Sequence, residues 1–428
     1  MTEEKPEFKA AVGLSREWDA YGAGVEVAQD TLQKLGCKPD FFLLFTTIHY
    51  EKHGGFKRFL EGVWNVLPEG TPLIGGTVAG FINPQGCYTR GTTALAVKYP
   101  NMDVAIGIGH NTKRNPKKAA QECAKPINSM FNNSKFQNTF IFDLISGSII
   151  PQIPGVGRKR ILGGLLSTIA ELSYNFSLYY LQKGSGREDE VIKEFIKETG
   201  GKTTLGGSSM DDNNAVVNYQ FFNKNCTTNS IVALAIKTDI TTTLTTDSGT
   251  KPTNKYFIAT KFSKDKRIIK EINNKPAVKG FLETLGWPSD FLNERLYRKT
   301  FHYPFTFRDK DGNVGQTEVG LILGSSVLFT YMSSDQKFQM SSATGKTILS
   351  GVVQSIQKQN NTSKLGLIVS CAARLEALGY KLYSVKNELD NYYRDSPYLD
   401  IYVMGESANI PAKGLFYGNL TFNMANFN

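Results

Sequence analysis

A short sequence motif occurs twice in this chain of 428 residues. Residues 73–80 read Leu-Ile-Gly-Gly-Thr-Val-Ala-Gly and are followed at 94–98 by Ala-Leu-Ala-Val-Lys, while residues 205–212 read Leu-Gly-Gly-Ser-Ser-Met-Asp-Asp and are followed at 233–237 by Ala-Leu-Ala-Ile-Lys. In each copy a short apolar strand leads into two glycines and small hydroxyl residues, then into a turn and a second apolar strand. The first glycine precedes that second strand by 19 residues in one copy (75 to 94) and by 27 in the other (206 to 233), and a loop insertion of that size costs little free energy. The repetition predicts an internal duplication.

The apolar pattern around the repeat predicts alternating helices and strands. Residues 24–36 have helical spacing, 41–48 form a continuous apolar run typical of a strand buried on both faces, and a helix is expected at roughly 53–66. A comparable order begins again at 138–145. We therefore predict an α/β (mixed α+β) fold, with duplicated mixed-sheet units and flanking helices.

The same pattern divides the chain into four segments. Residues 1–34 are expected to form an N-terminal extension and the first helix, and residues 35–240 a first domain with an internal repeat of about 100 residues. Residues 241–254 are rich in Thr and poor in large apolar side chains, which predicts a linker or an exposed hairpin. Residues 255–428 are expected to form a second domain that repeats the theme more loosely.

Composition places the protein among globular chains without a membrane span. The sequence is 40% hydrophobic and 21% charged, and no apolar run approaches the ~18–20 residues that cross a bilayer. The first residues, Met-Thr-Glu-Glu-Lys-Pro-Glu, lack the apolar stretch of a secretory signal. The five cysteines are scattered, with no Cys-x-x-Cys pair. We therefore predict a cytoplasmic protein with reduced thiols.

The net charge of +10 is concentrated in two basic clusters, at 113–118 and at 158–160. Such clusters suit an acidic partner, an anionic ligand or nucleic acid, but they also suit a solvated helix start and a solvated loop. Basic and aromatic residues do not alternate there, as they do in proteins that bind single strands. Nucleic acid is therefore not the expected partner.

The ordered motifs resemble the FIST family, whose name stands for F-box and intracellular signal transduction. In its N-terminal domain the family has an opening strand and two glycine-rich segments, which are matched here by residues 39–45, 75–80 and 206–211. A C-terminal FIST domain is matched more loosely over about 255–423, and the matching residues there are Cys371, Arg374, Gly379, Glu388, Gly405, Glu406, Asn419 and Thr421. One departure is that Gly418 stands where the family often has a histidine before Asn-x-Thr.

The resemblance implies a sensory protein that binds a small molecule, possibly an amino acid, and relays its occupancy to a signalling partner. No extra output domain is evident in the sequence, so the protein would be a stand-alone sensor. Some FIST-like proteins are described as haem-binding nitric oxide sensors, and His110, at the end of an apolar strand, is the best-placed iron ligand here. The other reading of His110 is a polar cap at a strand end. No cofactor other than this alternative haem is expected.

The matched residues predict a ligand cleft between the N- and C-terminal domains. Backbone N–H groups of Gly75, Gly76, Gly206 and Gly207, with the hydroxyls of Thr77 and Ser208, would hold a carboxylate, and Arg374 would clamp an anion. Asp211 or Glu406 would receive an ammonium group, while Cys371, Glu388 and Asn419 complete the expected set. The alternatives are a structural ion pair between Arg374 and Glu406, and glycines that serve strand packing alone.

Two further function classes compete with the sensor. Cys371 follows a strand and opens a helix, where the dipole would lower its pKa, so it is a plausible nucleophile, although no elbow or phosphate-loop motif supports an enzyme. We therefore expect no catalytic residue and no metal site. A protein-docking module that uses the two basic clusters is the remaining alternative.

Overall fold

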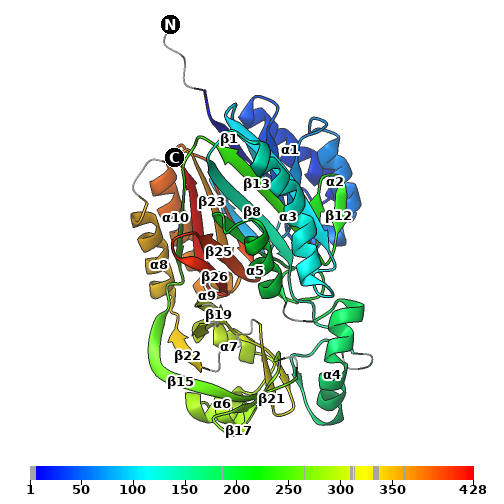
Figure 1. The fold of residues 1–428 in the computed structure, drawn as a ribbon, viewed down its shortest axis with the longest axis vertical. Coiled ribbons are helices and arrows are strands. Elements are labelled where there is room, and N and C mark those ends of the chain that lie inside the picture. Colours follow the sequence, from blue (N-terminus) through cyan, green and yellow to red (C-terminus); the bar gives the residue numbers. More distant parts are fainter. Residues whose placement is uncertain are drawn as a thin grey trace.

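A computed structural model describes residues 6–153, 155, 157–184, 187–264, 266–308, 312, 314–330, 337–359 and 363–428. The chain forms a body of three repeated units and a smaller lobe, which lies below the body in Figure 1. In each unit a strand, a helix, a strand, a helix and a strand are followed by a short hairpin and a closing strand. The predicted duplication is therefore confirmed, and the C-terminal part supplies a third copy.

The elements of the units follow the same order. The first unit contains β1 (Lys9–Ser15), α1 (Ala20–Leu35), β2 (Phe41–Thr46), η1 (Ile48–Glu51), α2 (Phe56–Trp64), β3 (Leu73–Thr77), β4 (Gly80–Asn83), β5 (Gly86–Tyr88) and β6 (Thr92–Lys98). The second contains β7 (Met102–His110), α3 (Pro116–Asn133), β8 (Asn138–Ser146), α5 (Glu188–Glu198), β10 (Thr204–Ser209), β11 (Gln220–Phe222), β12 (Asn225–Thr227) and β13 (Ser230–Thr238). The third contains β14 (Thr242–Asp247), α8 (Gly345–Gln357), β23 (Leu365–Cys371), α9 (Ala373–Leu378), η4 (Gly379–Lys381), α10 (Leu382–Tyr393), β24 (Tyr398–Val403), β25 (Glu406–Ile410), β26 (Gly414–Gly418) and β27 (Phe422–Phe427).

The units interlock by exchanging hairpins in a cycle. Their sheets share one strand order, which is β1-β6-β2-β3, β7-β13-β8-β10 and β14-β27-β23-β24. The hairpin β11–β12 of the second unit extends the first sheet, β25–β26 of the third extends the second, and β4–β5 of the first extends the third. Within each unit the last two strands of this order are parallel, namely β2 and β3, β8 and β10, and β23 and β24, and the other pairs are antiparallel. The sheets are therefore mixed, as predicted.

Alternate residues of the central strands pack between the three sheets. Strands β2, β8 and β23 correspond to one another in the three units. Their inward side chains are Phe41, Leu43 and Phe45 in the first unit, Phe140, Phe142 and Leu144 in the second, and Leu365, Leu367 and Val369 in the third. The residues between them face helices: Phe42 packs with α1 and α2, Ile141 with α3 and α5, and Ile368 with α8 and α10. Strands that are buried on both faces have continuous apolar sequences, which is why the sequence predicted them clearly.

The lobe is built from two insertions. The larger lies between β14 and α8 and contains β15 (Lys251–Phe262), β16 (Ile269–Ile272), β17 (Lys275–Pro276), α6 (Ala277–Leu285), η3 (Ser289–Phe291), α7 (Leu296–His302), β18 (Phe305–Arg308), β19 (Val314–Thr317), β20 (Val319–Leu323), β21 (Ser326–Phe329) and β22 (Lys337–Ser342). The smaller lies between β8 and α5 and contains β9 (Ile161–Leu162), α4 (Gly164–Phe176) and η2 (Ser177–Leu181). Its β9 pairs with β20, while β19 pairs with β26 and so joins the lobe to the body.

The structure changes three details of the predicted segments. Residues within 1–34 are not an extension, because β1 pairs along its length with β6 of the first unit. The Thr-rich stretch at 241–254 is not a hairpin, since its strand β14 pairs with β27 near the C-terminus. Strand pairing also crosses from 35–240 into 255–428, because β10 pairs with β25. The division into two FIST-type domains stays a prediction.

Candidate functional site

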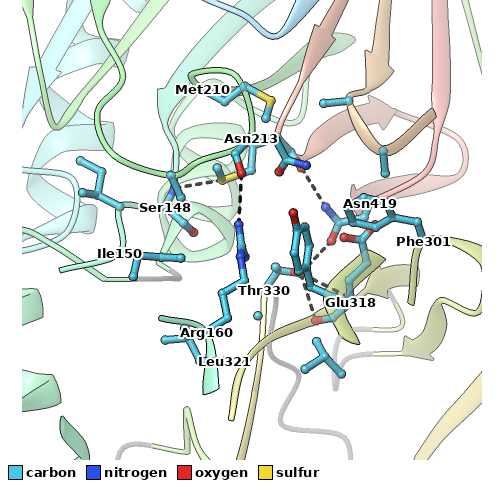
Figure 2. Close-up of a pocket in the computed structure, with 18 of the residues that line it drawn as sticks. Ser148, Ile150, Arg160, Met210, Asn213, Phe301, Glu318, Leu321, Thr330 and Asn419 are labelled. Atoms are coloured by element: carbon cyan, nitrogen blue, oxygen red, sulfur yellow. Dashed lines mark hydrogen bonds between the residues drawn. The ribbon is translucent and has the colours of Figure 1, made fainter. Parts of the chain in front are cut away.

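A cavity of ≈ 60 Å³ lies where strands of the second and third units end against the lobe. This volume is several times the ~10–15 Å³ that one water needs, so the cavity can hold a small molecule. Figure 2 shows side chains from both the body and the lobe pointing into it. The body contributes, among others, Ser148 after β8, Met210 after β10 and Cys371 at the end of β23. The strand ends are thus the floor of the site, and the lobe closes it.

Glu318 of the lobe places a carboxyl group in the cavity wall. It lies between β19 and β20 and is only 5% exposed. Its Oε1 is buried and has no hydrogen-bond partner among the residues that the structure describes. Burial raises its pKa well above the usual value, and the nearby Glu406 raises it further, whereas Arg160 acts in the opposite direction. An unpartnered buried carboxyl costs stability, so this oxygen can accept a hydrogen bond from, or donate one to, a polar group that enters the cavity.

Arg160 supplies a positive charge in the same cavity (Figure 2). It immediately precedes β9, and its Nη2 donates a hydrogen bond of 3.3 Å to the backbone oxygen of Asn213. Its guanidinium carbon lies 4.0 Å from the ring centre of Tyr297, so the group also makes a cation–π contact. Partial burial lowers its pKa, but a guanidinium stays charged in proteins. A half-buried guanidinium with donors to spare is suited to a carboxylate.

Asn419 connects the body to the lobe at the cavity wall. The hydroxyl of Thr330 donates to its Oδ1 at 2.8 Å, and its Nδ2 donates to the backbone oxygen of Met404, also at 2.8 Å. Thr330 belongs to the lobe, while Asn419 lies between β26 and β27. Asn419 was predicted to be a site residue, and the structure places it in the lining of this cavity.

Asp211 shapes the cavity without lining it. Its carboxylate accepts hydrogen bonds from the backbone N–H groups of Asn214, Ala215 and Val216 at 3.0, 3.0 and 2.7 Å. Asn213 and Ala215 line the cavity and have φ angles of 70° and 52°, which side-chain-bearing residues seldom adopt. Asp211 is therefore a positioning residue for this loop, not the ammonium acceptor that the sequence suggested.

Arg374 and Glu406 form neither the expected ligand clamp nor the alternative ion pair in the described part of the chain. Arg374 is 1% exposed and donates to the backbone oxygens of Leu420 and Ile348, both at 3.1 Å. Glu406 accepts from the backbone and hydroxyl of Thr421 at 3.0 and 2.9 Å, and burial raises its pKa to about 8. Arg374 thus holds backbone together beneath the site.

Cys371 lines the cavity, but its electrostatics are opposite to the expectation. Burial raises the pKa of its thiol well above the usual value, and the nearby carboxyl groups of Glu406 and Glu318 raise it further. These effects outweigh the helix that begins two residues later. The direction of this shift is opposite to the lowered pKa that the helix dipole predicted for a nucleophilic thiol.

The glycines are required by close packing. A Cβ on Gly75 would lie 1.7 Å from the backbone oxygen of Leu44, and one on Gly206 would lie 2.0 Å from Oδ2 of Asp143. Gly76 and Gly207 have comparable contacts with neighbouring strands, and none of these four glycines is among the residues lining the cavity. This observation supports the alternative that the glycines of the repeated motif serve strand packing alone.

The remaining predicted residues lie elsewhere. Thr77 and Ser208 are buried in β3 and β10, where Thr77 accepts a 3.0 Å hydrogen bond from the backbone of Tyr219. Glu388 is half-buried on α10, and it does not belong to the cavity lining. His110 is exposed at the end of β7, with its Nδ1 3.0 Å from Oγ of Ser230. An exposed ring at a strand end does not offer the enclosed pocket that haem needs, so His110 does not fit the haem alternative.

Sequence reasoning missed the two charged residues of the cavity. Arg160 belongs to the basic cluster at 158–160, for which the sequence left both an anionic ligand or acidic partner and a solvated loop open, and Glu318 carries no sequence signal. Lys113 of the other cluster is also buried, and its Nζ donates to the backbone oxygen of Gly147 at 2.7 Å. Each basic cluster therefore directs one cation inward, and only the fold shows which one.

Two searches of the described residues bear on metals and membranes. His, Cys, Asp and Glu side chains there form no group of three or more that could hold a metal ion. In the same ranges, none of the helices combines the length and the apolar character needed to cross a bilayer.

Comparisons with known proteins identify a family. The FIST N domain matches residues 40–275, which is more than half of the chain. The match supports neither a C-terminal FIST domain nor a link to F-box proteins. None of the curated proteins matches the chain. One solved structure, described as "Cyanuric acid hydrolase: evolutionary innovation by structural concatenation", has 10% identity, covers 98% of this chain and 100% of its own, and has a TM-score of 0.30. A likeness this distant carries no conclusion about activity.

Proposed function

Because the chain belongs to the family of the FIST N domain, a family of signal-transduction sensors, we propose that it senses a small polar molecule bound in the cavity between the body and the lobe. The observation that carries the proposal is the buried carboxyl of Glu318, whose Oε1 lacks a partner among the described residues and which shares the cavity with Arg160. A guanidinium and a carboxyl group in one small cavity suit a ligand that carries both an anionic and a cationic group.

An amino acid has the complementary chemistry. Its carboxylate would bind the guanidinium of Arg160, and its ammonium group would bind Glu318. A bound cation favours the ionised form of a carboxyl group, so the ammonium would lower the raised pKa of Glu318 and complete its hydrogen bonding. The ligand would then supply the partner that Oε1 of Glu318 lacks among the described residues.

The position of the cavity provides a route for the signal. Ligand contacts would come from the lobe through Arg160 and Glu318, and from the body through strand ends such as Ser148. A ligand that bridges the two parts stabilises the arrangement in which both touch it, because it shifts the population by its difference in affinity. We propose that a partner protein recognises the arrangement of lobe and body that the ligand favours.

The test is binding of the common amino acids, measured by thermal unfolding and then by calorimetry. A ligand at 100 times its Kd should stabilise the protein by ~2.7 kcal/mol. Arg160→Ala should weaken binding by ~10- to 100-fold, since a hydrogen bond to a charged group contributes ~1.5–3 kcal/mol. Arg58→Ala, an exposed arginine on α2, is the matched control and should bind like the parent protein. The proposal fails if no amino acid stabilises the parent, or if Arg160→Ala and Arg58→Ala bind equally well.

A further inference from the structure

A second cavity lies beside the first, beneath helix α4. Its volume is ≈ 230 Å³, against ≈ 60 Å³ for the first. Ile150, Pro151, Gly184 and Leu321 line both cavities, so the two are separated by no more than these shared walls. The chain therefore places a small cavity, which holds a guanidinium and a carboxyl group, beside a larger one.

The larger cavity is apolar. Its walls come from β9 and β20, through Leu162 and Leu323, and from α4, through Leu166 and Ile169. Lys159 is the single charged residue among those that line it in the described part of the chain, and it immediately precedes Arg160 of the first cavity. An apolar cavity of ~150 Å³ is already large enough to bind benzene, so this one has room for a hydrocarbon group.

A small polar ligand alone would leave this apolar space empty. The space is open to solvent, because Leu166, Ile169 and Phe176, which line it, are 37%, 59% and 55% exposed, and an apolar ligand would remove these side chains from water. The side chains that could close the cavity by collapse belong to α4, and this helix instead leaves Leu165 and Leu172 more than 80% exposed. The packing of α4 is thus loose enough for an occupant beneath it.

We infer that the two cavities form one bipartite site, and that the ligand is an amphiphile with a charged head and an aliphatic tail. The head would bind Arg160 and Glu318 in the first cavity, and the tail would pass the shared wall at Leu321 into the cavity under α4. For the head, this inference rests on the proposed function. For the tail, it rests on the second cavity alone.

The experiment uses the full chain and the straight-chain 2-amino acids with four, six, eight and ten carbons. These share one head and differ only in tail length. Affinity should rise about fourfold with each CH2 that enters the apolar cavity, the fold-change that corresponds to ~0.8 kcal/mol per buried CH2, and it should stop rising when the cavity is full. Affinity that is independent of tail length overturns the inference while the proposed function stands.

A pair of variants on α4 locates the tail. Ala170→Phe puts a ring into the apolar cavity and should abolish the gain from longer tails while leaving the four-carbon acid bound as before. Leu172→Phe adds a ring at a position that is 81% exposed, and it should leave the whole series unchanged. Thermal unfolding without ligand checks that both variants fold. Equal tail dependence in the two variants overturns the assignment of the tail to this cavity.

Straight-chain alcohols of the same lengths separate the two halves of the site. They lack both charges. An affinity that rises with tail length and falls in Ala170→Phe therefore supports the apolar cavity even if no amino acid binds. In that case the proposed head, and not the inferred tail site, is the part that fails. If neither alcohols nor amino acids bind with a dependence on length, the inference is overturned.

Discussion

The repeated body and the inserted lobe differ in what they contribute to the candidate site. The body is one pattern used three times, with hairpins exchanged between units and a shared core of alternate strand residues. The lobe occurs once, and it supplies Arg160, Glu318 and Thr330, whose polar groups face the strand ends of the body. The comparison teaches that the repeat builds a rigid platform, while the unrepeated insertions bring the chemistry to it.

The body is also packed more closely than the lobe. In the body, the glycines of β3 and β10 leave no space for a single added carbon. The lobe borders both cavities, and its helix α4 exposes several large apolar side chains, namely Leu165, Ile169, Leu172 and Phe176. Close packing leaves a core little room to adjust, so changes in the body should act on stability and changes in the lobe on binding.

Glycine substitution should show the largest contrast. Gly75→Ala in the body places a Cβ 1.7 Å from a backbone oxygen, and we expect a loss of ~3 kcal/mol or more in the free energy of unfolding. Gly163→Ala, at the N-cap of α4 in the lobe, meets no atom within 4 Å and has a negative φ, so it should lose only the N-cap preference for glycine over alanine, ~0.5–1 kcal/mol. Urea denaturation of both variants measures the difference, and equal losses would contradict the contrast.

Two arginines should separate stability from binding. Arg374→Ala removes a buried guanidinium and leaves the backbone oxygens of Leu420 and Ile348 without their donor, so we expect a loss of ~3 kcal/mol in the free energy of unfolding. Arg160→Ala removes a half-buried side chain with one hydrogen bond and should cost ~1 kcal/mol. The same urea titrations measure both. A stable Arg374→Ala variant that no longer binds ligand would reverse the roles assigned to the two residues.

A further prediction concerns the pH dependence of the body. Burial raises the pKa of Glu406 to about 8 from 4.5, so between these values the folded chain binds the proton that the unfolded chain has lost. Glu406 therefore makes the stability fall by about 1.4 kcal/mol per pH unit as the pH rises through this window. In Glu406→Gln, whose amide oxygen can still accept from Thr421, the slope should become shallower by that amount. Urea midpoints at a series of pH values test this, and an unchanged slope would show that Glu406 is ionised in the folded state.

Part of the site could be predicted from the sequence, and the part that failed has a common cause. Asn419 and Cys371 follow strands, where side chains of neighbouring units meet, and both line the cavity. The glycines were chosen because they repeat, but what repeats in three units is the packing of strands. Arg160 and Glu318 occur in the unrepeated lobe, and they are 158 positions apart in the sequence (160 to 318), so no local pattern connects them.

By itself, the sequence determined the repeated unit, the mixed sheets and the family, because alternation of apolar residues and glycine spacing are local properties of the chain. The tertiary structure alone decided which hairpin joins which sheet, which basic residues turn inward, and where a buried carboxyl lacks a partner among the described residues. These features depend on long-range contacts and on removal from water, and a side chain acquires them only when distant segments close around it.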